Sequence, residues 1–189
     1  MDIQAIKREL QAFEAADDRA DVYVLLKMVW NEHKTPALAS LIVQQMIDYL
    51  LWLDMGSPQE KWEYDSCRTL LIDALDYGSL NYPDDKLFLW LMLYYFSGYA
   101  TYYWLLDAVL AKRGPVEKVT KELADRAERV FPGSMMFRVS SDIRNADPTW
   151  TGRLSAEERI KLKAELTELK LQNNSADEKL KNLFHFEQL

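Results

Sequence analysis

A run of twenty uncharged residues, 87–106, constrains the fold of this 189-residue chain more than any other feature. Nine of the seventeen residues from Phe88 to Trp104 are aromatic. Because removing apolar surface from water is strongly favourable, this run must be buried in protein, in lipid or against a partner. The sequence therefore predicts that the other segments pack around residues 83–113.

The run is about as long as a membrane-spanning helix, but its composition argues against a span. Its five tyrosines would lie at membrane depth, whereas tyrosine is typical of the membrane–water interface. Ser97 and Gly98 also interrupt the run. We therefore expect no membrane span but a hairpin of two shorter helices that meet near Gly98. The first of them should begin at Pro83, and the second should end with Lys112 and Arg113.

Apolar residues recur at helical spacing along the rest of the chain, and alternating strand patterns are missing. Thr35 is expected to cap one helix, and Ser155 with Glu158 forms the capping-box pattern of another. A helix expected at 58–77 should end at Gly78. The predicted fold class is all-α, with about ten helices in antiparallel hairpins that stack as helical repeats do.

Residues 153–189 differ from the rest of the chain in composition. They are less aromatic and carry seven charges of each sign. Asp147-Pro148 and Gly152 mark a break before them. We expect a helical body at 1–152 and a C-terminal helical arm at 153–189 that packs on the body, within a single domain.

The prolines at 83, 115 and 148 are 32 and 33 residues apart, close to the period of helix-pair repeats. Residues 101–134 resemble one tetratricopeptide repeat. Trp104 matches the early aromatic position of that pattern, and Ala108 matches its small position. Gly114-Pro115 falls at the inter-helix turn, Ala127 at the late alanine and Pro132 at the closing proline. The window departs from the pattern at Asp107, Ala111, Thr120 and Ala124. The resemblance implies a stack of helix hairpins used for protein binding.

The sequence offers few residues for catalysis or metal binding. His33 and His185 are far apart in the sequence, and Cys67 is the one cysteine. A glycine-rich phosphate loop and a nucleophile elbow are both missing. We therefore expect no catalytic residue, no metal ligand and no cofactor, and the alternative is an enzyme with carboxylates assembled from separate helices. The N-terminus lacks a signal-peptide pattern, which favours a cytoplasmic location.

Acidic charge is concentrated in the middle of the chain. Residues 48–107 hold ten acidic and three basic side chains, so this segment alone accounts for the net charge of −7. Negative charge disfavours nucleic acid as a partner, because phosphates repel carboxylates. It favours a basic protein partner.

One face of the helix expected at 58–77 mixes hydrophobic and acidic residues. This face lies opposite the core side and holds Trp62, Asp65, Thr69, Ile72, Asp73 and Asp76. Aromatic anchors surrounded by charge are typical of binding surfaces, so these six residues are the candidate partner-binding site. As exposed charges, Asp73 and Asp76 should contribute little to stability. The alternative is that another helix covers Trp62 and Ile72.

These properties favour a non-enzymatic protein-binding module. A compact, acidic, cysteine-poor helical protein is similar in gross properties to bacterial toxin-immunity proteins. That similarity implies an inhibitor that neutralises a basic toxin or effector. A scaffold or chaperone-like adaptor for a secreted protein is a further alternative, because it would show the same features.

Overall fold

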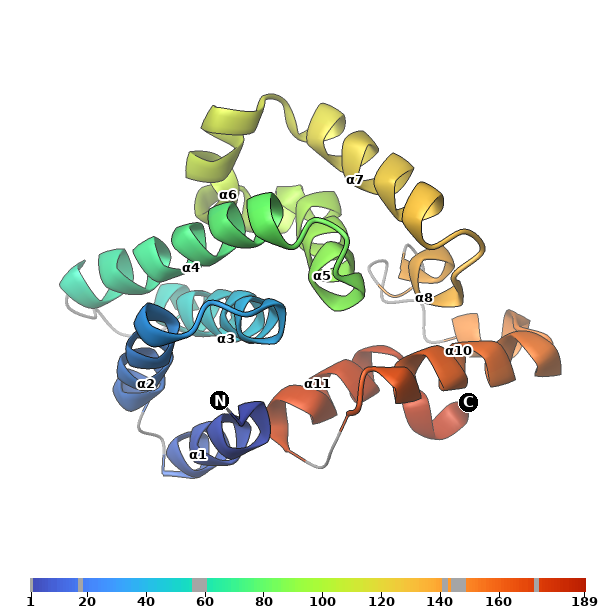
Figure 1. The fold of residues 1–189 in the computed structure, drawn as a ribbon, viewed down its shortest axis with the longest axis horizontal. Helices are drawn as coiled ribbons and strands as arrows, with labels where there is room; N and C mark the ends of the chain where they lie inside the picture. The colour runs from blue at the N-terminus through green and yellow to red at the C-terminus, as the bar shows by residue number, and fades with distance from the viewer. Residues whose placement is uncertain (1, 17–18, 56–60, 141–142, 144–148, 172–173) are drawn as a thin grey trace.

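The computed structural model describes residues 2–16, 19–55, 61–140, 143, 149–171 and 174–189. Within these ranges, the side chains of residues 19, 52–55, 61–63, 99–105 and 175 lie outside the description. The described residues form ten α-helices and two 3-10 helices and contain no strand (Figure 1), so the predicted all-α fold class is confirmed.

The helices are numbered in the order in which they occur along the chain. They are α1 (Ile3–Ala15), α2 (Arg19–Glu32), α3 (Pro36–Met55), α4 (Lys61–Asn81), α5 (Lys86–Ser97), α6 (Tyr99–Arg113), α7 (Val116–Val130), α8 (Met135–Arg138), η1 (Trp150–Arg153), α10 (Ala156–Glu168), α11 (Ser175–Leu183) and η2 (Phe186–Gln188). The cap predicted at Thr35 is confirmed, because its hydroxyl accepts from the backbone N–H of Leu38 (3.3 Å).

Helix α5, the first half of the uncharged run, lies at the centre of the molecule. Eight of its twelve residues are buried, and it packs against α3, α6 and α7 (Figure 1). The next helix, α6, begins directly after Gly98, so the predicted division of the run at this residue is confirmed. Across the described parts of the chain, we find no helix with both the length and the hydropathy for a membrane span.

The start of α5 differs from the prediction. The helix begins at Lys86 rather than at Pro83. Before it, the backbone N–H of Asp85 donates to the carbonyl of Tyr82 (3.1 Å), which closes a turn. The Asp85 carboxylate then accepts from the backbone N–H of Phe88 (2.9 Å) and caps the helix. A side-chain cap at Asp85 therefore sets this boundary, instead of the preference of proline for a first turn.

Helix α4 also differs, because it continues through Gly78, where it was expected to end, and stops at Asn81. The ring of Phe88 lies directly against Gly78, and a Cβ added to this glycine would be 2.3 Å from Phe88 Cζ. Phe88 is fully buried, so its ring has little room to move. Close packing of α4 on α5, rather than a helix end, requires glycine at this position.

Gly78→Ala is expected to destabilise the protein by about 1–3 kcal/mol, because overpacking outweighs the gain of roughly 1 kcal/mol in helix propensity. Urea denaturation followed by circular dichroism measures the change. Gly152→Ala is the matched control, since its added Cβ would meet no atom within 4 Å. A Gly78→Ala protein as stable as the Gly152→Ala protein would contradict the packing argument.

The C-terminal helices complete the core of the earlier ones. Helix α10 packs on α8, and α11 packs on α1 and α3. Buried Phe184 lies against Trp90 of α5, with ring centroids 4.8 Å apart. The capping box predicted at Ser155 and Glu158 is confirmed and begins α10.

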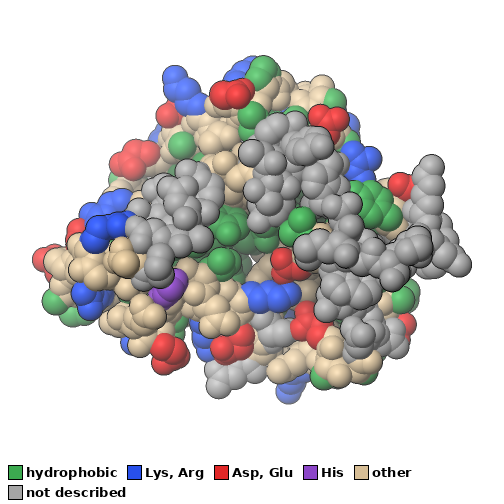
Figure 2. All heavy atoms as spheres, turned by 180° about the vertical axis from the view of Figure 1, so that it is seen from behind, with side chains coloured by type: hydrophobic (Ala, Val, Ile, Leu, Met, Phe, Trp, Pro, Cys, Tyr) green, Lys and Arg blue, Asp and Glu red, His purple; other side chains and the backbone are tan. Residues whose placement is uncertain are grey.

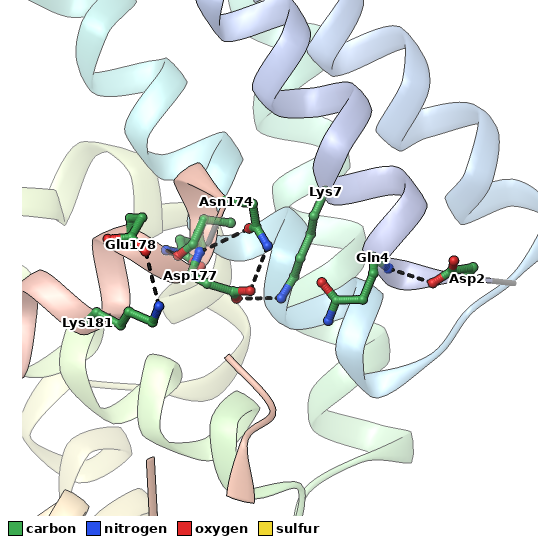
Figure 3. Close-up of polar contacts among 9 residues, drawn as sticks. Asp2, Gln4, Lys7, Asn174, Asp177, Glu178 and Lys181 are labelled. Atoms are coloured by element: carbon green, nitrogen blue, oxygen red, sulfur yellow. Dashed lines mark hydrogen bonds and ion pairs between the residues drawn. The ribbon is translucent and has the colours of Figure 1, made fainter. Parts of the chain in front are cut away.

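A buried polar network joins the first helix to the last α-helix (Figure 3). Lys7 Nζ of α1 lies 2.5 Å from one carboxylate oxygen of Asp177, and Asn174 Nδ2 donates to the other (2.8 Å). Gln44 of α3 donates to the carbonyl of Ala176 (2.9 Å). Asp177 is only 1% exposed, so Lys7 compensates its charge inside the protein.

The tetratricopeptide-like window contains two adjacent helices. Helix α6 ends at Arg113, Gly114 and Pro115 make the turn, and α7 begins at Val116. The two helices pack against each other. Because paired antiparallel helices occur in many all-α folds, the repeat assignment stays a prediction.

Candidate partner-binding groove

A groove of about 410 Å³ lies between α2 and α4; we call it the α2–α4 groove. Its floor is formed by buried side chains of Tyr23, Trp30 and Leu70. Its walls come from residues one helical turn apart on each helix: Lys27, Asn31, Asp65, Ser66, Thr69 and Asp73. The groove therefore has an apolar floor and polar walls.

Three of the six predicted partner-binding residues, Asp65, Thr69 and Asp73, line this groove. Thr69 Oγ1 donates to the backbone carbonyl of Asp65 (2.7 Å). The carboxylate of Asp65 is exposed and makes no hydrogen bond or ion pair with the described residues. The side chain of Trp62 lies outside the described residues, so its expected role as an anchor stays a prediction.

Ile72 and Asp76 do not line the groove. Ile72 is half-buried and packs on the hydrophobic core. Asp76 follows Asp65 by eleven residues, which is about 16 Å along a helix. There its carboxylate pairs with Lys112 (2.7 Å) and Arg113 (3.4 Å) at the end of α6. These two residues therefore connect α4 to neighbouring parts of the protein.

Asp73 has a structural role as well as a place in the groove. Its Oδ2 accepts from the indole N–H of Trp30 (2.6 Å) and lies 3.1 Å from Lys34 Nζ. Burial acts to raise the pKa of Asp73, but the hydrogen bonds from Trp30 and Lys34 and the charge of Lys34 bring the pKa below its ordinary value. Asp73 is exposed, as expected, with 51% of its side chain accessible, and its bonds to Trp30 and Lys34 give it contacts within the protein that the sequence did not predict.

Asp73→Ala is expected to lower the free energy of unfolding by about 1–3 kcal/mol, because it leaves the buried indole N–H of Trp30 without an acceptor. Asp73→Asn keeps a carbonyl oxygen there and should lose less. The matched control is Asp65→Ala, which removes an exposed carboxylate from the same helix and should change stability by less than about 0.5 kcal/mol. Equal unfolding midpoints in urea for the two alanine variants would contradict this role.

Two exposed hydrophobic side chains on α2 are next in sequence to residues that line the groove. Val24 and Met28 are 57% and 54% exposed and lie one turn apart, next in sequence to the lining residues Tyr23 and Lys27. They are two of the four large hydrophobic residues exposed in the described part of the chain. Both fall outside the buried stripe of α2. Their position on the polar side of an amphipathic helix could have marked them as exposed from the sequence, which was searched only for the buried stripe of this helix.

The face of the molecule opposite to the view in Figure 1 carries both acidic and basic side chains. Acidic and basic side chains are interspersed around the rim of this face, and hydrophobic ones gather near its centre (Figure 2). The described side chains of this face therefore mix both signs, although residues 48–107 carry an excess of seven acidic charges. Charge alone does not single out a docking surface there.

The described residues include neither a cluster of metal ligands nor an exposed cysteine. Among them, no three His, Cys, Asp or Glu side chains lie close enough together to hold a metal ion. Cys67 is buried in the core, as expected for a small apolar residue. The described lining of the α2–α4 groove contains two carboxylates, Asp65 and Asp73, both on α4, and no histidine.

Comparison with known proteins gives no assignment for this chain. No family model matches it, and no curated protein or solved structure is significantly similar to it. The geometry of the groove is therefore the basis on which a function can be assigned.

Proposed function

We propose that this protein is a non-enzymatic protein-binding module that holds a segment of a basic partner in the α2–α4 groove. The observation that carries the proposal is an apolar groove floor beside the exposed carboxylate of Asp65, with two exposed hydrophobic residues, Val24 and Met28, next in sequence to lining residues of α2. An apolar centre with a charged rim is the usual anatomy of a protein interface.

The charges around the groove favour a cationic segment. Asp65 makes no ion pair with the described residues, whereas Asp73 already binds Lys34. The cation in the described lining, Lys27, donates to the hydroxyl of Tyr23 (2.8 Å). A lysine or arginine of the partner would form a charge-assisted hydrogen bond with Asp65. The acidic segment 48–107 would attract such a partner over a longer range.

Two forms of this function differ in the state of the partner. An inhibitor of a basic toxin or effector binds the folded partner and suppresses its activity. A scaffold or chaperone-like adaptor binds a partner that is unfolded or partly folded before secretion. The net charge of −7 supports both, and we put the inhibitor first because its partner is expected to be basic.

Affinity capture from the native host, with the neighbouring genes expressed, tests the proposal. Mass spectrometry should identify one basic protein at stoichiometric yield. Its activity, measured with and without this protein, separates an inhibitor from an adaptor. Recovery of no basic protein, or of a small-molecule turnover activity in the purified chain, would contradict the proposed class.

Once the partner is in hand, Met28→Ala is expected to speed its dissociation by about 30-fold, the equivalent of about 2 kcal/mol for a lost apolar anchor. Asp65→Lys should instead slow association and weaken its dependence on salt. Surface plasmon resonance measures both rates. Ile160→Ala is the matched control, because Ile160 is also exposed (69%) but lies on α10. If both groove variants bind as the control does, the interface lies elsewhere.

A further inference from the structure

A second groove, of about 570 Å³, lies between α5 and α7; we call it the α5–α7 groove. These are neighbouring helices that pack against each other (Figure 1). The floor is apolar and is formed by Phe88, Leu89, Met92, Val119 and Leu123. The first four of these side chains are buried, so this surface is already part of the core.

Three arginines from two helices surround this apolar floor: Arg113 at the end of α6, and Arg126 and Arg129 on α7. Arg113 Nη2 donates to the backbone carbonyl of Leu75 (3.3 Å) and to the carboxylate of Asp76 (3.4 Å). Arg126 Nε lies 3.6 Å from a carboxylate oxygen of Asp84. Arg129 is exposed and makes no ion pair or hydrogen bond with the described residues. Among the described residues of this lining, Arg129 is therefore the guanidinium whose donors have no partner and can meet a ligand.

Two carboxylates, Glu122 and Asp125, line the same groove. Glu122 already lies 3.8 Å from Lys118, one turn away on α7. Three guanidinium groups and two carboxylates leave the described lining with a net positive charge. Asp76 and Asp84, just outside the lining, pair with Arg113 and Arg126, so the positive charge that no described residue pairs with is that of Arg129.

We propose that the α5–α7 groove binds a small amphiphile with one anionic headgroup, a carboxylate or a phosphate, whose hydrocarbon part lies on the floor. Apolar clefts of about 300–1,000 Å³ with a few convergent polar groups are the common form of small-molecule sites. The planar fork of a guanidinium matches the oxygens of a carboxylate or phosphate. The proposal is independent of partner binding, because it rests on different helices.

Isothermal titration calorimetry of the purified protein with decanoate and with decyl phosphate, at neutral pH, tests the proposal and distinguishes the two headgroups. We expect saturable binding of at least one of them at a single site. Decanol has the chain without the charge and acetate has the charge without the chain. Both should bind at least about tenfold more weakly, the loss expected for one hydrogen bond to a charged group.

Arg129→Gln should weaken binding of the charged amphiphile by about tenfold, because it removes the guanidinium with no partner in the described structure. Arg8→Gln is the matched control, since Arg8 is an exposed arginine on α1, and it should bind as the wild type does. Three results would overturn the proposal. They are the absence of saturable binding, equal affinity for decanol and the charged amphiphiles, and equal affinity of the two arginine variants.

Discussion

Trp90→Ala is expected to lower the free energy of unfolding by about 3–5 kcal/mol. Trp90 is fully buried. Its ring centroid lies 5.1 Å from that of Tyr94 and 4.8 Å from that of Phe184. Its indole N–H donates to the carbonyl of Met136 (3.2 Å). The substitution would leave a cavity where α5, α8 and the C-terminal segment meet, and would leave that carbonyl without its donor.

Urea denaturation followed by circular dichroism measures this loss. Trp90→Phe keeps an aromatic ring and should lose less, mainly the hydrogen bond to Met136. Val24→Ala, at an exposed position, is the control and should be close to wild type. A loss below about 1 kcal/mol for Trp90→Ala would mean that the uncharged run is not the core. The same loss is predicted for Trp104→Ala, although the side chain of Trp104 lies outside the described residues.

Glu165→Ala is the second substitution with a large expected effect, about 3–5 kcal/mol, because it removes one partner from a buried ion pair. Glu165 of α10 accepts from Ser134 Oγ (2.5 Å) and from the backbone N–H of Met135 (2.9 Å) at the start of α8. Lys86 Nζ of α5 lies 3.1 Å away. Without the carboxylate, these donors would lose their acceptor. Water would not easily replace it, because Glu165 is only 8% exposed in the native protein.

The contribution of Glu165 should depend on pH. Burial acts to raise its pKa, but hydrogen bonds from Ser134, Met135 and Lys86 and the charge of Lys86 bring the pKa below the ordinary value of 4.5. A lowered folded-state pKa stabilises the protein above the unfolded-state pKa, and this stabilisation is lost as the pH falls through the folded-state pKa. The difference in stability between wild type and Glu165→Gln should therefore be largest near neutral pH and decrease in acid. Glu168→Gln, at an exposed site on the same helix, is the control, and a difference for Glu165→Gln that stays constant with pH would contradict the linkage.

The helices were predictable from the sequence wherever local signals decide the outcome. The uncharged run divides at Gly98 as expected, and Thr35 and Ser155 cap the helices that follow them. The boundaries at Pro83 and Gly78 were not predictable in this way. An aspartate cap decides the first, and the packing of Phe88 from another helix decides the second. At such positions, hydrogen bonds and packing contacts that form only in the folded protein override the helix propensity of the individual residue.

The sequence predicted the part of the candidate site that lies on α4, but not the part that lies on α2. Helical period alone places Asp65, Thr69 and Asp73 on one face of α4. The opposite wall comes from α2, and no local pattern states which helix α4 will meet. The bond from Trp30 to Asp73 spans 43 residues, so the structural role of Asp73 depends on the same long-range pairing. The α5–α7 groove, too, has walls from separate helices, and the sequence interpretation did not anticipate it.

The network between α1 and α11 has a consequence for the chain during its synthesis. Lys7 and Asp177 are 170 residues apart in sequence. A ribosome adds about 5–20 residues each second, so roughly 10–30 s pass between the two. During that interval the faces of α1 and α5 that later contact α11 and Phe184 remain open to solvent. A nascent chain truncated before residue 174 should therefore keep apolar surface exposed, bind chaperones and be degraded.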